Sequence, residues 1–344
     1  MTTVSVLMPA YNCEKYISEA INSVLNQSFP NFELIIVNDG STDNTHGVIS
    51  AFSDPRIRYY QNKLNEGLNH VRNKLVGLSK GDFIAFLDSD DVAEKNRLEL
   101  EYNVLASNKD IGLVAGSVRS KDENGVEDKT SWKFNLDPVK LKVHLLFYNP
   151  IVTSAVMFKK EMLPSEIFRE GYPPCEDYDL WVRMLLKGKG VVLPEILATY
   201  RLYHNSVSKR KADDARNNRN KVIVDQLRYY FDKEYSENEK ILHLSLVEFS
   251  LKNKISDLDL LSAWIGKLLV LNQQHRHFDE RVLKQLLYER ILKKFLRLEE
   301  YNYSVYQTLS ALRKKLQPEL TFELRKKEWA ILAFALAKKK FIQV

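Results

Sequence analysis

The sequence predicts an α/β fold with a mostly parallel sheet and helices on both faces, followed by an all-helical C-terminal region. Short apolar runs alternate with stretches of helical period through residues 1–208, a pattern typical of parallel sheets covered by helices. Eleven of the 12 glycines and nine of the 10 prolines lie before residue 195. Only Gly266 and Pro318 interrupt the helical spacing that dominates residues 209–344.

The predicted strands are short, rich in β-branched residues and closed by turn residues. They cover residues 4–8, 32–37, 57–60, 83–87 and 111–115, with a further strand-like stretch at 191–199. The apolar spacing predicts helices at residues 17–25, 69–78 and 94–106, and another that starts at Cys175. In the C-terminal region it predicts helices at 221–230, 241–251 and 281–298. Continuous apolar strands of this kind are usually buried on both faces.

Charge and length indicate two domains. The chain has 344 residues, which is typical of two domains of ordinary size. Residues 1–208 carry 23 Lys and Arg against 27 Asp and Glu, whereas residues 209–344 carry 28 against 18. The net charge therefore changes from −4 to +10. We expect a boundary near residues 204–210, between a ligand-binding domain (1–208) and a basic helical region (209–344).

Composition also narrows the class of protein. No stretch approaches the ~20 apolar residues that a membrane-spanning helix needs. Residues 1–12 show neither a basic leader nor a long apolar run, so we expect no secretory signal. Cys13 and Cys175 have neither metal-ligand spacing nor a disulfide pattern, which suits a cytoplasmic protein. The basic region contains no basic–aromatic motif of a nucleic-acid-binding module, and we expect no nucleic-acid partner.

Polar side chains follow three of the predicted strands. The strand exits read Pro9-Ala10-Tyr11-Asn12, Asn38-Asp39-Gly40-Ser41-Thr42-Asp43 and Asp88-Ser89-Asp90-Asp91. Parallel sheets bind ligands at the carboxyl ends of their strands, so we expect these groups to face one site. The three carboxylates at 88–91 repel one another unless a cation lies among them. They indicate either a Mg²⁺ or Mn²⁺ site or a solvated turn in which Asp91 caps a helix.

The other motifs each allow an ordinary structural role and a functional one. Asp39 either forms a turn or accepts a hydrogen bond from a nucleotide base, with the ring of Tyr11 available for stacking. Arg72 is either a surface cation or a nucleotide contact. The acids at 176–179 either stabilise a helix N-terminus or provide a general base. His204 is either structural or a ligand.

Taken together and in this order, the motifs resemble those of family-2 glycosyltransferases with the GT-A fold, a Rossmann-like architecture. The matching stretches are residues 5–12, 38–43, 65–67 with 72–73, 81–91 and 176–181. The resemblance covers residues 1–208 and does not extend to residues 209–344. Two departures are Asn38-Asp39, where many relatives have two acids, and the two residues between Arg201 and His204, where relatives often have one.

The resemblance implies a role for each matching residue. Pro9, Tyr11 and Asp39 would hold the base of a nucleotide-sugar, with Arg72 assisting there, and Asp88 would contact the ribose. Asp90 would ligate Mn²⁺ or Mg²⁺, with Asp91 and His204 beside it. Asp177 would be the catalytic base, placed with the help of Glu176, and Asp179 is the alternative base.

The implied reaction is an inverting transfer of a sugar, UDP-linked in the commonest case, to a hydroxyl of a glycan or lipid-linked acceptor in cell-surface polysaccharide synthesis. A nucleotidyltransferase is a second interpretation, which should show a glycine-rich basic loop after the first strand. A third is a non-catalytic, membrane-associated scaffold, which should lack Asp90 or Asp177. Both residues are present, and the first strand is followed by Pro9-Ala10-Tyr11-Asn12 instead.

The C-terminal segment carries an apolar stretch, 329–337, between the basic clusters 325–327 and 338–340. Nine helical residues rise only ~13.5 Å at ~1.5 Å each, which is too short for a hydrocarbon core of ~30 Å. We expect this helix either to lie in the surface of an anionic membrane or to pack on its own domain or in a homodimer. The first alternative predicts a peripheral protein on the inner face of the plasma membrane.

Overall fold

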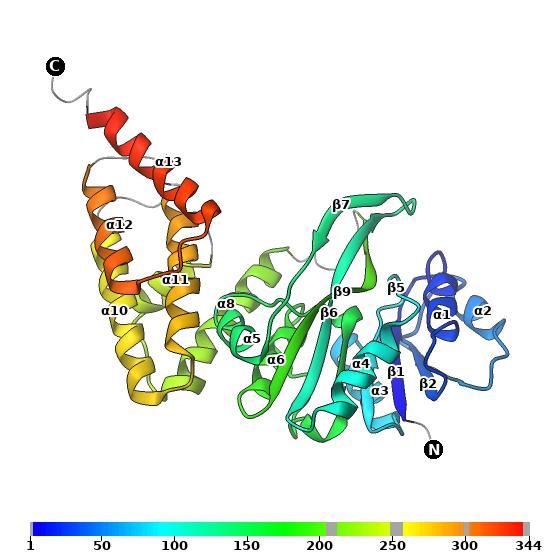
Figure 1. Ribbon diagram of the computed structural model, residues 1–344. Coiled ribbons are helices and arrows are strands. Elements are labelled where there is room, and N and C mark those ends of the chain that lie inside the picture. Colours follow the sequence, from blue (N-terminus) through cyan, green and yellow to red (C-terminus); the bar gives the residue numbers. More distant parts are fainter. Residues whose placement is uncertain (1–2, 204–211, 248–256, 297, 299–302, 340–344) are drawn as a thin grey trace. The chain divides into compact units, whose positions relative to one another are not determined.

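The computed structural model describes residues 3–203, 212–247, 257–296, 298 and 303–339 (Figure 1). The chain forms two compact units. The sheet unit comprises Met1–Leu141 and Asn149–Val222, and the helical unit comprises Lys142–Tyr148 and Ile223–Val344. The boundary expected at residue 208 falls outside the described residues and stays a prediction.

The sheet unit is built on one sheet that has nine strands in the part of the chain described. Eight of them follow in the order β3-β2-β1-β4-β8-β6-β9-β5, and β7 pairs with β6. Their bounds are β1 Val4–Ala10, β2 Phe32–Asn38, β3 Ile57–Gln61, β4 Phe83–Phe86, β5 Val92–Ala93, β6 Ile111–Asp122, β7 Glu127–Trp132, β8 Val156–Lys159 and β9 Lys189–Leu202. Neighbouring strands among β1–β4 pair in parallel, as do β6 and β9.

Three strands run antiparallel to their neighbours: β8, β5 and β7. The sequence analysis did not predict them. β5 has two residues and β8 has four, which is too short for a clear period, and β7 (EDKTSW) contains charged and polar residues typical of loops. The predicted mostly parallel α/β sheet is confirmed.

Helices cover both faces of this sheet. α1 (Ile17–Leu25) and α4 (Arg97–Ser107) share one apolar cluster with Val4, Val6 and Met8 of β1, which alternate along the strand. On the other face, Phe86 of β4 lies edge-on to Phe168, and Phe158 of β8 contacts Trp181. This face carries α3 (Leu68–Leu78) and α6 (Glu176–Leu185), while α2 (Thr45–Ser50) packs against α1. Two short 3₁₀ helices flank β8, at Thr153–Ala155 and Lys160–Met162.

A buried arginine ties α4 to the centre of the sheet. The Arg97 side chain is fully buried and donates to the carbonyls of Phe86 (2.9 Å) and Val156 (3.1 Å). Its other partner is Glu101, one helical turn along. Burial raises the pKa of Glu101 to about 7, although Arg97 opposes the shift. Because Phe86 lies two residues before Asp88, this pair also fixes the exit of β4.

The helical unit contains α9 (Glu237–Ser245), α10 (Asp257–His275), α11 (Glu280–Phe295), α12 (Tyr303–Leu316) and α13 (Phe322–Lys339). Two further helices continue into it from the sheet unit, α5 (Pro138–Leu145) and α8 (Ala212–Phe231). Its core includes Trp264, Leu287 and Ile291, all nearly inaccessible to solvent. Ser236 forms a capping box with Glu239 at the start of α9. Among the described residues no helix is both long enough and apolar enough to cross a membrane.

The predicted helical C-terminal region is confirmed. The helices predicted at 221–230 and 281–298 lie within or around α8 and α11. The one predicted at 241–251 corresponds to the end of α9, and its residues 248–251 lie outside the described part of the chain. Residues 142–148 belong to this unit although they lie far earlier in the sequence, because their carbonyls accept from later side chains. Gln226 donates to the carbonyl of Leu145 (2.7 Å).

Candidate active site

The exits of β1 and β2 are joined by hydrogen bonds. The Asn12 N–H donates to Ser41 Oγ (2.9 Å), and the Thr42 N–H donates back to Asn12 Oδ1 (2.8 Å). Asn12 has a φ of 47°, a left-handed conformation that asparagine tolerates. These bonds hold the ring of Tyr11 at the surface, where it is 47% exposed. Pro9 lies inside β1, buried and paired with Val37, so it shapes the strand exit.

Asp39 is buried at the end of β2 and accepts three hydrogen bonds. The donors are Asn62 Nδ2 (2.8 Å), the Glu66 N–H (2.9 Å) and the Gly67 N–H (2.9 Å). The turn at residues 65–67 therefore wraps around this carboxylate. A carboxylate has about four acceptor positions, so one remains for a ligand.

Asn38 stands where many relatives have an acid, and its contacts explain the amide. Its Oδ1 accepts from the N–H and the hydroxyl of Ser41 (3.1 and 2.6 Å), and its Nδ2 donates to Tyr59 (3.1 Å). An ionised carboxylate could accept the first two bonds and would accept from the Tyr59 hydroxyl where the amide now donates to it. The departure at position 38 leaves Asp39 and its hydrogen bonds in place.

Arg72 connects two parts of the site. Its side chain is 4% exposed, with one nitrogen 2.6 Å from Glu176 Oε1 and another 3.1 Å from Asp88 Oδ1. Burial opposes its charge, but Asp88, Glu176 and Asp177 together raise the pKa of Arg72. The guanidinium therefore fixes the exit of β4 to the start of α6, across 104 residues of sequence. Its predicted contact with the nucleotide base stays a prediction.

Asp177 lies in the first turn of α6, beside Glu176. Its Oδ2 accepts from the Thr153 hydroxyl (3.0 Å), and its Oδ1 from the Tyr178 N–H (2.6 Å). Burial raises the pKa of Asp177, and the Arg72 charge limits that rise. Burial also raises the pKa of Glu176, whose Oε2 is buried without a partner. The helix start thus holds two carboxylates that take up a proton more readily than exposed ones.

Asp179, the alternative base, is engaged elsewhere. It is 2% exposed, and its two oxygens are held by the guanidinium groups of Arg169 and Arg183. Both cations lie on one carboxylate, so its charge is compensated and its lone pairs are occupied. This arrangement suits an ion pair that anchors α6, and it favours Asp177 as the base.

The carboxylates at the exit of β4 form a second cluster. Asp90 Oδ2 accepts from the Tyr203 hydroxyl (2.8 Å). Asp91 is 1% exposed; its Oδ1 accepts from the Arg201 N–H (2.9 Å), and its Oδ2 is buried without a partner. Burial and the charge of Asp88 raise the pKa of Asp90. Burial and the charges of Asp90 and Asp88 raise that of Asp91 well above its usual range.

The crowding of three carboxylates at one strand exit suits a bound divalent cation. The described residues contain no group of three or more His, Cys, Asp or Glu side chains arranged around a common metal position. Mg²⁺ and similar ions need no such group when phosphate oxygens and waters complete the shell around one or two carboxylates. His204, the other predicted ligand, lies outside the described residues.

Two groups around the acidic cluster were not assigned a role from the sequence. Tyr203 binds Asp90, and Arg201 donates from Nε to the Asp90 carbonyl (2.9 Å) and lies over the ring of Tyr16 (4.3 Å). The alternation of β9 could have indicated that residues 201 and 203 share a face. Thr153, a partner of Asp177, follows no recognisable motif.

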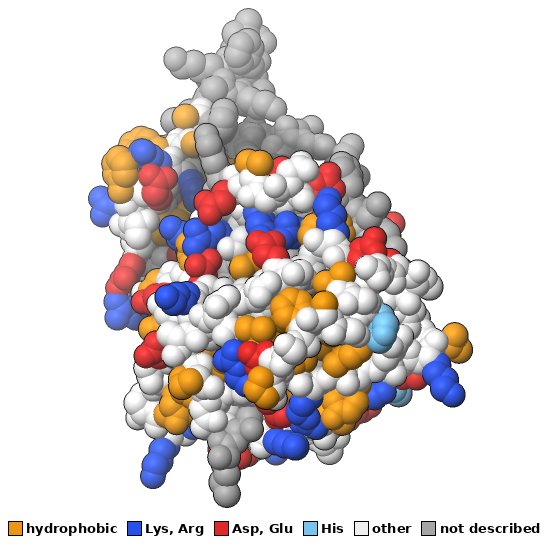
Figure 2. All heavy atoms as spheres, turned by 90° about the vertical axis from the view of Figure 1, so that its right-hand side faces the viewer, with side chains coloured by type: hydrophobic (Ala, Val, Ile, Leu, Met, Phe, Trp, Pro, Cys, Tyr) orange, Lys and Arg blue, Asp and Glu red, His pale blue; other side chains and the backbone are white. Residues whose placement is uncertain are grey.

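In the view of Figure 2, acidic and basic side chains are interspersed over the described surface.

Comparison with known proteins identifies the family of this chain. The family model described as "Glycosyl transferase family 2" matches residues 5–163. A Haemophilus influenzae protein described as an uncharacterized glycosyltransferase is 31% identical over 313 residues, covering 86% of this chain and 96% of that protein. The Escherichia coli UDP-Glc:alpha-D-GlcNAc-diphosphoundecaprenol beta-1,3-glucosyltransferase WfgD is 33% identical over 211 residues, covering 60% of this chain and 80% of that protein.

A solved structure has a similar fold. The crystal structure of S. aureus TarS 1-349 in complex with UDP-GlcNAc superposes with a TM-score of 0.54 at 20% identity, covering 92% of this chain and 91% of that one. The sheet unit and the helical region that follows it have the fold of a GT-A glycosyltransferase. The chain belongs to glycosyl transferase family 2.

Proposed function

We propose that this enzyme transfers a sugar from a UDP-sugar to a hydroxyl of a glycan or lipid-linked acceptor, with inversion at the anomeric carbon. WfgD is named for a UDP-Glc donor and a diphosphoundecaprenol-linked acceptor, and TarS was crystallised with UDP-GlcNAc. Cell-surface polymer synthesis is the setting that these relatives support. Membership of family 2 removes the nucleotidyltransferase interpretation.

One observation carries the proposal: Arg72 joins Asp88, on the donor side, to Glu176, which neighbours Asp177 on the acceptor side. In our proposal Asp177 takes the proton of the acceptor hydroxyl. The oxygen then attacks the anomeric carbon as the bond to the diphosphate breaks. A single displacement requires one base and no protein nucleophile, which suits the raised pKa of Asp177 and its fixed orientation through Thr153.

The carboxylate oxygens of Asp39 and the ring of Tyr11 suit binding of the nucleotide part of the UDP-sugar. Asp39 retains acceptor capacity for the N3–H of uracil, and the exposed Tyr11 offers a flat surface beside it. Asp90 and Asp91 would hold Mn²⁺ or Mg²⁺. When bound, the cation supplies positive charge that stabilises the departing diphosphate.

The C-terminal helix supports a peripheral contact with an anionic membrane. Phe322 and Trp329 are 71% and 69% exposed on α13, and Arg325 and Lys326 are exposed between them. Leu324 and Ile331 are buried, so the opposite side of this helix packs on its own unit. An amphipathic helix with exposed aromatics and cations is typical of membrane-surface binding, which would bring a lipid-linked acceptor to the enzyme. A homodimer contact is the alternative use of the same surface.

The proposed function is tested by incubating the full chain with UDP-sugars and Mn²⁺ and following UDP release, with GDP-sugars as the control for the base. Transfer to a synthetic lipid-diphosphate-linked sugar is then examined by NMR, which reads the anomeric configuration. We expect UDP release and an inverted product. A retained configuration would refute the single displacement, and release only from GDP-sugars would refute the donor assignment.

A further inference from the structure

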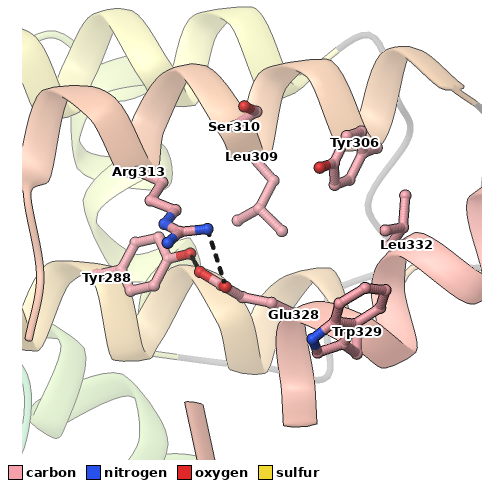
Figure 3. A pocket seen from close by; sticks show the side chains of 8 residues that line it. All are labelled: Tyr288, Tyr306, Leu309, Ser310, Arg313, Glu328, Trp329 and Leu332. Carbon is pink, nitrogen blue, oxygen red and sulfur yellow. Dashed lines mark hydrogen bonds and ion pairs between the residues drawn. The ribbon is translucent and has the colours of Figure 1, made fainter. Parts of the chain in front are cut away.

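A pocket in the helical unit lies between α11, α12 and α13 (Figure 3). It has a volume of about 160 Å³. Its lining combines aromatic, apolar and hydrogen-bonding side chains: Tyr288, Tyr306, Leu309, Ser310, Arg313, Glu328, Trp329 and Leu332. Figure 3 shows Tyr306 and Leu309 pointing from α12 toward α13, with Trp329 on the facing helix. Ligand sites are typically concave, mostly apolar and equipped with a few convergent polar groups.

The polar groups of this pocket are held in place by one another. Glu328 pairs with Arg313 (3.4 Å) and accepts from the hydroxyl of the buried Tyr288. Burial and the Glu328 charge raise the pKa of Tyr288, so its hydroxyl keeps the proton that it donates. Arg313 is 50% exposed, which leaves nitrogens of its planar fork accessible to a ligand. The pocket thus presents oriented donors and acceptors with one positive and one negative charge.

The aromatic part is exposed to an unusual degree. Trp329 is 69% exposed beside a pocket, whereas Ile331, two residues later, is fully buried. An exposed indole ring has not gained the free energy of burial. A ligand that covers the ring therefore gains apolar contact, and its polar groups can bond the indole N–H. Tyr306 is half-buried on the opposite helix. A flat ring beside hydrogen-bonding side chains matches a molecule that has an apolar face and a rim of hydroxyls.

We propose that this pocket binds one neutral sugar ring of a glycan chain. A pyranose has a face of C–H groups that can lie on an indole, and hydroxyls that can both donate to Glu328 and accept from Arg313. The balanced charge of the Arg313–Glu328 pair favours a neutral ring over a phosphate, which would be repelled by Glu328. The inference rests on the proposed function only in taking the glycan to be the acceptor or product of the enzyme.

The test measures binding, so that it stays separate from catalysis. Full-length protein is titrated with chitotetraose, cellotetraose and maltotetraose while tryptophan fluorescence is followed. Trp329 is the most exposed of the four tryptophans, because Trp181 and Trp264 are buried and Trp132 is half-buried. We expect at least one tetrasaccharide to shift the emission, with a dissociation constant in the millimolar range. Trp329→Ala should weaken that binding about tenfold or more, measured by saturation-transfer NMR.

Phe322→Ala is the matched control. Phe322 is an aromatic residue on the same helix with nearly the same exposure, 71%, and it does not line the pocket. It should leave saccharide binding unchanged, and UDP binding should be equal in all variants. Arg313→Gln is the second variant and should also weaken saccharide binding; its melting temperature reports how far the lost pair with Glu328 destabilises the protein.

Three results would overturn the proposal. They are the absence of binding by all three tetrasaccharides, equal binding by Trp329→Ala and wild-type protein, and equal losses in Trp329→Ala and Phe322→Ala. If Trp329→Ala and Phe322→Ala lose vesicle binding equally and neither changes saccharide binding, Trp329 belongs to a membrane-binding surface instead. If a saccharide binds but UDP does not, sugar binding by the pocket is supported and the proposed UDP-sugar donor is refuted.

Discussion

At the scale of single residues, the site consists of carboxylates whose burial is offset by specific partners. Asp39 is held by backbone N–H groups, Asp179 by two guanidinium groups, and Asp90 by a tyrosine hydroxyl. Asp177 accepts from the Thr153 hydroxyl, the Tyr178 N–H and, at 3.5 Å, Asn149 Nδ2, and the Arg72 charge limits the rise of its pKa. Asp177 is buried and the donors that contact it are neutral, which suits a group that has to accept a proton.

Asp177→Asn should lower turnover by about 10²–10⁴-fold, the usual scale for a lost general base. Binding of the UDP-sugar should change little, because the amide oxygen of asparagine can still accept the hydrogen bond from the Thr153 hydroxyl. Calorimetry of UDP binding and initial-rate kinetics separate the two effects. Asp179→Asn should act on stability instead: it breaks two ion pairs and should therefore lower the melting temperature. Equal activity of Asp177→Asn and wild-type enzyme would remove Asp177 from the mechanism.

The pH profile follows from the same residue. Asp177 acts as a base only when deprotonated, so activity should rise with pH through its pKa. Burial raises that pKa above the ordinary value of about 3.9, so the acid limb should lie above this value. The pH dependence of kcat/KM measures it. An acid limb at or below the ordinary value would contradict the raised pKa.

Asp90→Ala should abolish the gain in UDP affinity that Mn²⁺ provides, because it removes a carboxylate from the cluster at the β4 exit. Tyr203→Phe should weaken the Mn²⁺-dependent affinity about tenfold, since it deletes a hydrogen bond to a charged group. Calorimetry of UDP with and without Mn²⁺ reads both changes. Tyr16→Phe is the control, because it retains the ring that lies under Arg201. Unchanged Mn²⁺ dependence in Asp90→Ala would exclude Asp90 as a ligand.

At the scale of elements, the loops at the strand exits depend on one another. Gly40 has a φ of +66°, and a Cβ there would lie 2.5 Å from the carbonyl carbon of Leu64, next to the turn that donates to Asp39. Only glycine fits both the conformation and the space. The strand exit and the 65–67 turn are therefore one structure, although they lie in different loops.

Gly40→Ala should weaken UDP binding strongly, because the turn must move away from Asp39. Gly125→Ala is the matched control: its φ is +85°, but nothing lies within 4 Å of the added Cβ. Both variants should lose about 1 kcal/mol or more of stability through the backbone strain, measured by chemical denaturation. Only Gly40→Ala should also lose UDP affinity, measured by calorimetry. Similar UDP affinities in the two variants would show that the close approach is unimportant.

At the scale of the whole molecule, the charge is divided between the two parts of the chain. Residues 1–208 carry −4 and residues 209–344 carry +10. Each cation near an anionic membrane contributes on the order of 1 kcal/mol, so a basic segment with exposed aromatics can hold a protein at that surface. In our proposal the basic C-terminal residues supply this attraction and the sheet unit supplies the chemistry.

Removal of residues after Thr321 should reduce co-sedimentation with vesicles that contain anionic lipid. Because truncation also removes part of the pocket in the helical unit, Lys326→Glu with Lys327→Glu is the sharper variant, and it should reduce binding at low salt. Lys95→Glu with Lys109→Glu changes the net charge equally at exposed positions of the sheet unit and is the control. If both double variants sediment alike, α13 is not the anchor.

The α/β class, the helical C-terminal region and the acids at the ends of strands could all be predicted from local sequence. Period, turn residues and charge are local properties, and the carboxyl ends of parallel strands share one edge of a sheet. The antiparallel strands β8 and β5 were not predicted, because strands this short show no periodicity.

The partner of each site residue could not be predicted in this way, because it depends on three-dimensional packing. Arg72 meets Glu176 across 104 residues, and Thr153 orients Asp177 from a 3₁₀ helix that no motif marks. The pocket between α11, α12 and α13 likewise exists only once three helices pack. Partners of this kind depend on long-range packing, because a buried charge takes whichever compensating group the fold brings within reach.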